Sequence, residues 1–442
     1  MFKRKIYRKL LDWKETSAGQ TALLIEGARR IGKSTIVEEF AKNEYKSYIF
    51  IDFAFAPKNI HKLFENLYDL DYFFLQLQLQ YGVDLYERES LIVFDEVQFN
   101  PLARQAIKKL VADGRYDYLE TGSLISIHKN VKDILIPSEE RRIEMFPMDF
   151  EEFLWALGDE TTNDLLKKAF ESGISLGEDQ NRNMLQKFRL YMLVGGMPQA
   201  VKTYVESNNF RMVDEIKRDI IDLYLEDFYK IDPSGKISTL FEAIPGELSR
   251  NSSRYQVSSV LKNQRYSTIL QEIAELKESK TVLVAYNTDD PNVGLSSTLN
   301  LDKFKLYMGD TGLMVTLMFK DKDFTENVIY KQLLGNKLQK NLGMVYENIV
   351  AQTLAFNLHR LVYYSFYDEE KKRTFEVDFI LSEGNKVNPI EVKSSNYRVH
   401  RSLDAFSVKY FSRIKKKYLI HIKDYQREKD IIGLPFYMAQ FL

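Results

Sequence analysis

The chain has 442 residues, which is too long for a single hydrophobic core, so we expect two to four domains. Its 62 basic and 63 acidic residues give a formal charge of −1, which neither requires nor excludes a nucleic-acid partner. The absence of cysteine excludes disulfides and a thiolate nucleophile, and five widely spaced histidines argue against a zinc enzyme.

The N-terminal segment is basic and amphipathic, and its spacing predicts a helix from Lys5 to Trp13. It lacks the apolar core of a signal peptide, and no later run approaches membrane-spanning length. We therefore expect a soluble cytoplasmic protein without a membrane partner.

The stretch GARRIGKST follows an apolar strand pattern, Ala22–Glu26, and opens an amphipathic helix pattern. Two glycines, Lys33 and Ser34 stand at the spacing of a P-loop, in which backbone N–H groups surround the phosphates. Lys33 would bridge the β- and γ-phosphates of ATP, and Ser34 would bind Mg²⁺. The candidate nucleotide-binding residues are Gly27, Ala28, Arg29, Arg30, Ile31, Gly32, Lys33, Ser34 and Thr35.

Two further elements follow the P-loop helix. Lys46–Phe55 has the alternating to apolar pattern of a strand, and Asn59–Tyr81 is irregularly helical. The run FFLQLQLQ in the second stretch could also be read as an edge strand, but we favour a helix.

The run LIVFDEVQ, Leu91–Gln98, predicts a buried parallel strand that ends in two acids. After a P-loop, this pattern is typical of a Walker B site. Asp95 would hold Mg²⁺ through water, and Glu96 would polarise the attacking water.

The next strand pattern, YDYLETGS, ends in Thr121, Gly122 and Ser123, where a polar side chain can sense the γ-phosphate. RRIEMFPMDFEEFL then brings Arg141 and Arg142 into another strand before a helix. Together with LVGGMPQA and FKLYMGDTGLM, these motifs resemble the prokaryotic AAA-type ATPases that carry a C-terminal domain of unknown function.

This resemblance implies roles for two further residue types. Ser123 matches the polar sensor, and Arg141 or Arg142, with Arg142 as our candidate, matches an arginine that acts on the nucleotide of a neighbouring subunit. Such an arginine finger in trans would make hydrolysis depend on a homo-oligomer. The alternative for both arginines is a solvated entry to the strand.

The middle of the chain is helical from about Glu160 to Tyr229, which matches an AAA lid in the resemblance. Three short helix patterns and a strand pattern then run from Ile237 to Tyr286, in the order of a winged helix-turn-helix. The outer face of the third helix is poor in basic residues, so a role in protein packing is as plausible as a role in DNA contact.

The C-terminal part resembles the PD-(D/E)xK nuclease fold, with Val377 in place of the proline. A helix carries Glu347, and a hairpin carries Asp378 and the Glu-x-Lys pair Glu391 and Lys393. The three acids would bind Mg²⁺, and Lys393 would orient or deprotonate a water at a phosphodiester. The alternative is a strand pair whose acids and lysine make only salt bridges.

Basic residues exceed acidic ones in the C-terminal tail, where aromatic residues are interspersed among them. This composition suits contact with a DNA backbone, although it is also typical of a solvated helix face. The basic residues are Arg398, Arg401, Lys409, Arg413, Lys415, Lys416, Lys417, Lys423, Arg427 and Lys429.

We therefore expect an α/β protein with a P-loop AAA-type parallel sheet. The expected domains are an ATPase core (1–158), a helical lid (159–232), a winged-helix-like domain (233–319) and a restriction-endonuclease-like α/β domain (320–442). The predicted function couples ATP hydrolysis with Mg²⁺ to DNA binding or processing. The alternative is a nucleotide-dependent switch that acts on a protein partner through an inactive nuclease-like scaffold; a nucleotide kinase is disfavoured.

Overall fold

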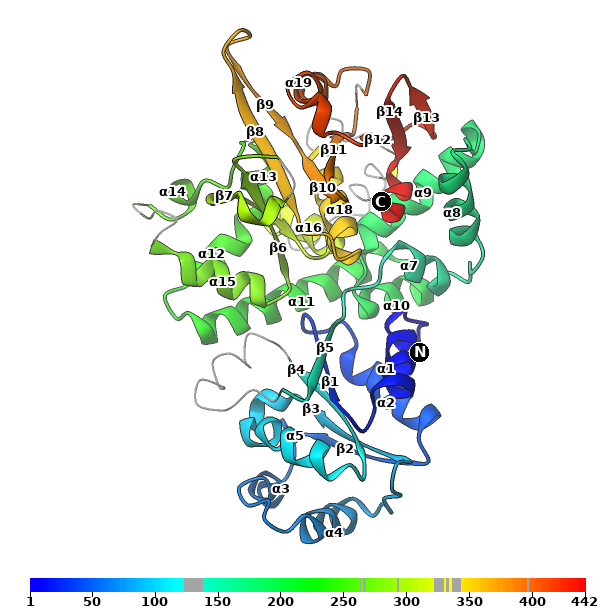
Figure 1. Ribbon diagram of the computed structural model, residues 1–442, viewed down its shortest axis with the longest axis vertical. Coiled ribbons are helices and arrows are strands. Elements are labelled where there is room, and N and C mark those ends of the chain that lie inside the picture. Colours follow the sequence, from blue (N-terminus) through cyan, green and yellow to red (C-terminus); the bar gives the residue numbers. More distant parts are fainter. Residues whose placement is uncertain are drawn as a thin grey trace. The chain divides into compact units, whose positions relative to one another are not determined.

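The computed structural model describes residues 1–122, 138–250, 252–262, 264, 268–291, 294–321, 330, 334–335, 343–395 and 397–442. The chain forms two compact units (Figure 1). The first contains Met1–Phe146 and Glu278–Lys280, and the second contains Pro147–Lys277 and Thr281–Leu442. Among the described residues, no helix is both long and apolar enough to cross a membrane.

The first unit is built on a five-stranded parallel sheet with the strand order β2-β3-β4-β1-β5. Its strands are β1 (Ala22–Glu26), β2 (Ser47–Asp52), β3 (Ser90–Asp95), β4 (Asp117–Gly122) and β5 (Glu140–Glu144). Because β4 lies between β1 and β3, the P-loop strand and the strand ending in Asp95 are separated by one strand. All five strands run in the same direction, so their carboxyl ends meet at one edge of the sheet.

The helices of this unit are α1 (Ile6–Thr16), α2 (Lys33–Glu44), α3 (Lys58–Leu63), α4 (Leu70–Tyr81) and α5 (Pro101–Asp113). The predicted helix over the run FFLQLQLQ is confirmed by α4. Phe73, Phe74 and Leu77 are its buried residues, at helical spacing, and the Asp69 side chain caps it by accepting a hydrogen bond from Tyr72 N at 2.9 Å.

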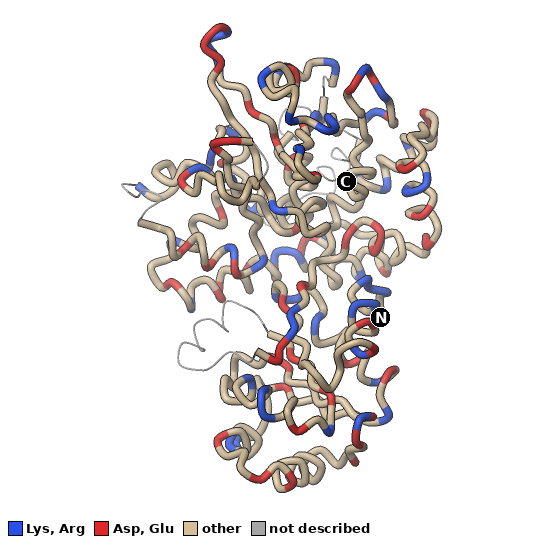
Figure 2. The backbone as a smooth tube through the Cα atoms, in the orientation of Figure 1, with Lys and Arg blue, Asp and Glu red and all other residues tan. Residues whose placement is uncertain are grey.

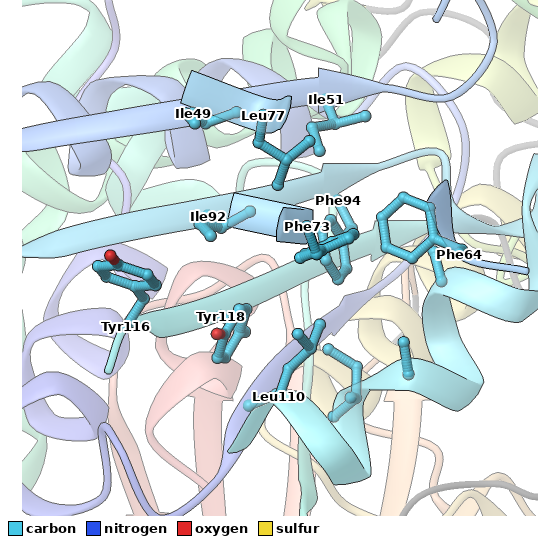
Figure 3. Packing of buried hydrophobic residues seen from close by; sticks show 14 of the residues in the cluster. Ile49, Ile51, Phe64, Phe73, Leu77, Ile92, Phe94, Leu110, Tyr116 and Tyr118 are labelled. Atoms are coloured by element: carbon cyan, nitrogen blue, oxygen red, sulfur yellow. The ribbon is translucent and has the colours of Figure 1, made fainter. Parts of the chain in front are cut away.

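An aromatic cluster packs α3 and α4 against the sheet (Figure 3). The ring centroid of Phe64 lies 5.2 Å from that of Phe73 and 5.4 Å from that of Phe94, both in edge-to-face geometry. Phe94 immediately precedes Asp95 in the chain. This packing therefore fixes the end of β3, from which the predicted catalytic acids project.

The second unit begins with a series of helices. They are α7 (Phe150–Ala156), α8 (Thr162–Ser172), α9 (Glu178–Val194), α10 (Pro198–Ser207), α11 (Phe210–Ile231), α12 (Lys236–Glu242), α13 (Ile244–Ser249), α14 (Val257–Val260) and α15 (Leu270–Glu278). The predicted helical character of the lid region is seen in α8 to α11.

A four-stranded sheet with the order β7-β6-β8-β9 follows. Its strands are β6 (Val282–Thr288), β7 (Leu299–Met308), β8 (Val362–Asp368) and β9 (Arg373–Val377). In this sheet β6 pairs in parallel with β8, with Tyr286 opposite Val362. This sheet therefore contains strands from both sides of the expected boundary between residues 319 and 320. The predicted winged-helix-like and C-terminal domains contribute to the same sheet.

A second sheet in this unit has the order β10-β11-β12-β14-β13. It consists of β10 (Phe379–Glu383), β11 (Lys386–Lys393), β12 (Lys417–His421), β13 (Gln426–Glu428) and β14 (Ile431–Pro435), accompanied by helices α16 (Thr311–Met318), α18 (Gly343–Phe356) and α19 (Arg401–Lys409). The predicted strand FEVDFIL is divided by Asp378. The chain leaves the four-stranded sheet before this residue and enters the five-stranded sheet after it.

The motifs LVGGMPQA and GDTGLM meet inside the second unit. Asp310 caps α16 by accepting a hydrogen bond from Leu313 N at 2.9 Å, and it also accepts one from Gly196 N at 2.6 Å. A Cβ on Gly196 would lie 2.1 Å from the carbonyl oxygen of Met148, so only glycine fits there. These motifs therefore serve packing in the described structure.

Candidate functional site

The loop between β1 and α2 has the backbone of a phosphate-binding loop. Gly32 has a φ of +91°, and Arg30 also adopts a positive φ, of 68°. A Cβ on Gly27 would lie 2.3 Å from the carbonyl oxygen of Met145. The two glycines of the motif are therefore required by conformation and by close approach.

Lys33 lies against this loop and is buried. Its ammonium donates to the carbonyl oxygens of Gly27 and Ala28, both at 2.9 Å. Burial lowers the pKa of Lys33 to about 8, although Glu96 and Asp95 favour its charged form. A nucleotide phosphate must therefore compete with these two carbonyl contacts for the ammonium.

Arg4 supports the loop from the residues before α1. Its guanidinium donates to Ile31 O at 2.9 Å and to Phe146 O at 2.6 Å. It thereby ties the loop to the segment that follows β5. In the sequence, Arg4 is one of several basic N-terminal residues, and nothing distinguishes it from its neighbours.

Asp95 joins three elements at the edge of the sheet. Its Oδ1 accepts a hydrogen bond from Ser34 Oγ on α2 at 2.8 Å and another from Thr121 Oγ1 on β4. Burial raises the pKa of Asp95, while these two hydroxyl groups oppose that rise. The structure thus brings together the predicted Ser34 and Asp95 and adds Thr121.

These oxygen atoms fit the predicted magnesium ion. Mg²⁺ prefers hard oxygen ligands and is commonly held by one or two protein groups together with water and phosphate oxygens. A hydroxyl and a carboxylate 2.8 Å apart are close enough to serve the same ion. Ser34 and Asp95 are therefore the residues that would hold it.

Glu96 follows Asp95 in a left-handed conformation, with a φ of 52°. Such a conformation is uncommon for residues other than glycine and often occurs at functional sites. Gln98 Nε2 donates to Glu96 Oε2, and Glu96 N contacts Thr121 Oγ1 at 3.4 Å. The carboxylate is therefore oriented by Gln98, a residue of the predicted strand motif to which the pattern assigns no role.

The other two predicted residues of this unit are Ser123 and Arg142. Ser123 lies outside the described residues. Arg142 lies on β5, where its guanidinium contacts Glu140 at 2.8 Å and Glu26 at 3.4 Å. To act on the nucleotide of a neighbouring subunit, Arg142 would have to exchange these carboxylates for phosphate.

The predicted residues of the C-terminal site come from different elements of the second unit. Glu347 is on α18, Asp378 lies between β9 and β10, and Glu391 and Lys393 are on β11. Asp378 Oδ2 accepts a hydrogen bond from Val392 N at 2.7 Å. Burial raises the pKa of Asp378 well above its usual value, and repulsion from Glu347 adds to this shift.

Protein groups occupy both carboxylate oxygens of Glu391. Oε1 pairs with Lys393 at 2.7 Å, and Oε2 accepts a hydrogen bond from Leu403 N at 2.9 Å. Lys393 therefore contacts an acid of its own strand. This is the contact that the salt-bridge alternative predicts.

Glu347 is held by residues that the sequence did not single out. Its Oε1 accepts hydrogen bonds from Lys305 Nζ at 2.9 Å and from Tyr307 OH. Lys305 also contacts Glu376 Oε1 at 2.6 Å. Both donors lie on β7, in the stretch FKLYMGD, which the sequence marked only as a family motif.

The carboxylates do not form the expected metal site. Within the described part of the chain, no group of three or more His, Cys, Asp or Glu side chains is arranged to hold a metal ion. Glu347, Asp378 and Glu391 are instead bound by lysine, tyrosine and backbone donors. The predicted Mg²⁺ ligand set does not fit this arrangement.

Comparison with protein families finds a match over most of the first unit. Residues 19–154 match the model of a family described as an AAA domain. Residues 185–323 and 342–437 match two families described as domains of unknown function, DUF8612 and DUF4143. The predicted AAA-type P-loop ATPase domain is thus confirmed, whereas the nuclease-like character of the C-terminal part stays a prediction. No curated protein matches the chain.

Three solved structures are similar to parts of the chain. PCH-2 of C. elegans shares 12% identity with a TM-score of 0.24, over 47% of this chain and 60% of that one. The RuvB Holliday junction branch migration motor of Thermotoga maritima shares 13% with a TM-score of 0.28, over 64% and 89%. Cdc6p of Pyrobaculum aerophilum shares 11% with a TM-score of 0.23, over 75% and 92%. The chain thus spans about 60% of the length of PCH-2, and these values assign it no activity.

The lowered pKa of Lys33 predicts that ATP binding depends on pH. Phosphates favour the ammonium, so binding takes up a proton wherever free Lys33 is partly neutral. With a pKa of about 8, ATP affinity should fall above pH 8, by up to about tenfold per pH unit. Calorimetric titration between pH 7.5 and 9.5, in buffers of different ionisation enthalpy, measures both the affinity and the proton uptake.

The variant Lys33→Arg is the matched control, because a guanidinium does not lose its proton in this range. If it binds ATP, its affinity should not fall with pH. Wild-type affinity that stays constant over the range, with no proton uptake, would contradict the lowered pKa.

Proposed function

We propose that the first unit hydrolyses ATP with the help of Mg²⁺. The observation that carries this proposal is the pair of hydroxyl contacts on Asp95, which joins the P-loop helix to the acid strand and to β4. Lys33 would bind phosphate oxygens, and Ser34 and Asp95 would hold the ion. Bound Mg²⁺ would neutralise phosphate charge as the bond to the γ-phosphate breaks.

In this proposal Glu96 positions and polarises the attacking water. Its backbone conformation and its bond to Gln98 fix the carboxylate beyond the end of β3. A preorganised carboxylate of this kind needs little rearrangement during the reaction. Arg142 is proposed to act in trans within a homo-oligomer, since 40% of its side chain is exposed on β5.

Two substitutions separate binding from hydrolysis. Lys33→Ala removes the phosphate ligand and should reduce ATP hydrolysis to background. Glu96→Gln keeps the size of the side chain but removes the base, so we expect ATP to bind while turnover falls about 100-fold or more. Steady-state phosphate release and equilibrium ATP binding measure the two effects. Normal hydrolysis by Lys33→Ala would refute the proposed site.

We further propose that the nucleotide state is coupled to DNA binding by the C-terminal part. Figure 2 shows positive charge along α19 and the segment after it. Exposed basic residues there, which we call the basic tail surface, are Arg398, Arg401, Lys409, Arg413, Lys415, Lys416, Lys423, Arg427 and Lys429. Phe411 lies among them and is 78% exposed, so it could stack on an unpaired base.

The predicted winged-helix-like region is a weaker candidate for contact with DNA bases than the basic tail surface. On α15, Gln271 bonds Glu275 at 2.8 Å, and Glu272 pairs with Lys236 at 3.0 Å. This face is acidic and would repel phosphates. The proposal therefore assigns DNA contact to the basic tail surface and packing to α12–α15.

The triple variant Arg401→Gln, Lys409→Gln and Arg413→Gln tests the basic tail surface. If each residue meets one phosphate, the slope of log affinity against log salt should become shallower by about 3, and affinity at low salt should fall about tenfold or more. Fluorescence anisotropy with a labelled oligonucleotide at several salt concentrations measures both. Replacing Lys167, Lys168 and Lys202, also exposed, gives a control with the same change in charge.

A wild-type chain that does not bind DNA even at low salt would overturn the DNA proposal while leaving the ATPase proposal intact. That result would favour the second candidate function, a nucleotide-dependent switch acting on a protein.

One surface of the first unit favours this second candidate. Tyr68, Tyr72, Leu75 and Leu79 are each more than half exposed and lie on or just before α4 at helical spacing. No charged residue occurs in α4 after Asp71, so a partner for this face should be uncharged and apolar. Comparing ATP turnover with and without a candidate protein partner would examine this function.

A further inference from the structure

The C-terminal acid cluster contains more negative charge than the predicted metal site requires. Besides Glu347, Asp378 and Glu391, it includes Glu376 on β9. Lys305 links Glu347 to Glu376, which stands two residues before Asp378, and Asp378 accepts a hydrogen bond from Val392 N, the residue after Glu391. Such a group is costly to bury unless a cation neutralises it.

Lys305 supplies that cation from a strand outside the C-terminal family match. Its Nζ lies 2.9 Å from Glu347 and 2.6 Å from Glu376, and only 7% of its side chain is exposed. Burial favours a neutral amine, but the carboxylates of Glu347 and Glu376 at these distances favour the charged form. The ammonium therefore stays charged between two acids.

We propose that Lys305 takes the place of a divalent cation in this cluster, so that the C-terminal part is held together without a metal. A metal ion bound by Glu347 would have to displace Lys305 and Tyr307 from the same oxygen. It would also bring two positive charges close to a buried ammonium, which repels them. In the same way, Lys393 and the Leu403 amide contact the two carboxylate oxygens of Glu391.

This arrangement has a consequence for nucleic acids. Phosphodiester cleavage at this site would need a carboxylate-bound metal and a free lysine near the attacking water. Here Lys305 and Lys393 are both paired with acids. The C-terminal part is therefore a scaffold that does not cut DNA, whether or not the first unit hydrolyses ATP.

Terbium luminescence tests the inference on the full-length chain. Tb³⁺ favours oxygen ligands, and neighbouring tyrosines such as Tyr307 would sensitise its emission. The background Asp95→Asn weakens the predicted metal site of the first unit. In that background we expect no terbium to bind at the acid cluster. Adding Asp378→Asn should therefore leave terbium binding unchanged.

Replacing the lysine should open the cluster. In the same background, Lys305→Met should gain a terbium site at least about tenfold tighter than any that the background protein shows, and Asp378→Asn should abolish it. Lys303→Met, two residues earlier on β7, removes the same charge and should gain none. Circular dichroism and thermal unfolding establish that each variant is folded.

Two results would overturn the inference. One is a terbium site, lost on Asp378→Asn, that already exists with Lys305 in place. The other is a folded Lys305→Met variant without a new site. If Lys305→Met does not fold, the comparison between the background protein and its Asp378→Asn derivative still decides the question.

Discussion

The geometry of the candidate site in the first unit depends on the position of one carboxylate. Asp95 accepts hydrogen bonds from Ser34 and Thr121 and so connects the helix after the P-loop to two strands of the sheet. Because the side chain is buried, these hydroxyl groups offset part of the cost of its charge. The same contacts place a hydroxyl and a carboxylate 2.8 Å apart, where the proposed Mg²⁺ would meet both. The atoms that satisfy the buried acid are therefore the atoms that we propose as metal ligands.

The second unit neutralises its acids differently. In the first unit Asp95 is held by hydroxyl groups, which can give way to a metal ion. In the second, Glu347 and Glu376 share an ammonium with a raised pKa, and Glu391 has its own lysine. Clusters that look alike in sequence thus differ in the group that balances their charge. We infer that the first is suited to metal chemistry and the second to holding strands and helix together.

How much the sequence predicts depends on how local each interaction is. The strand Ala22–Glu26 follows from local periodicity and is found in the structure. The run FFLQLQLQ alternates as an edge strand would, but it forms the helix that we favoured. Thr121 and Gln98 stand beside predicted residues, but their roles depend on which strands become neighbours. Lys305 precedes its partner Glu347 by 42 residues, and only the folding of β7 beside α18 brings the two together. The sequence singled out Glu347, Asp378 and Glu391 but could not show which protein groups neutralise or bind them.

The ATP turnover of Thr121→Val, compared with that of Thr121→Ser, measures what the hydroxyl contact on Asp95 contributes to hydrolysis. Valine has the shape of threonine but cannot donate to Asp95, whereas serine keeps the hydroxyl group. A hydrogen bond to a charged group contributes about 1.5–3 kcal/mol, so turnover of the valine variant should fall about 10- to 100-fold with ATP still bound. The serine variant should stay close to wild type. Wild-type turnover by Thr121→Val would show that hydrolysis does not depend on this contact.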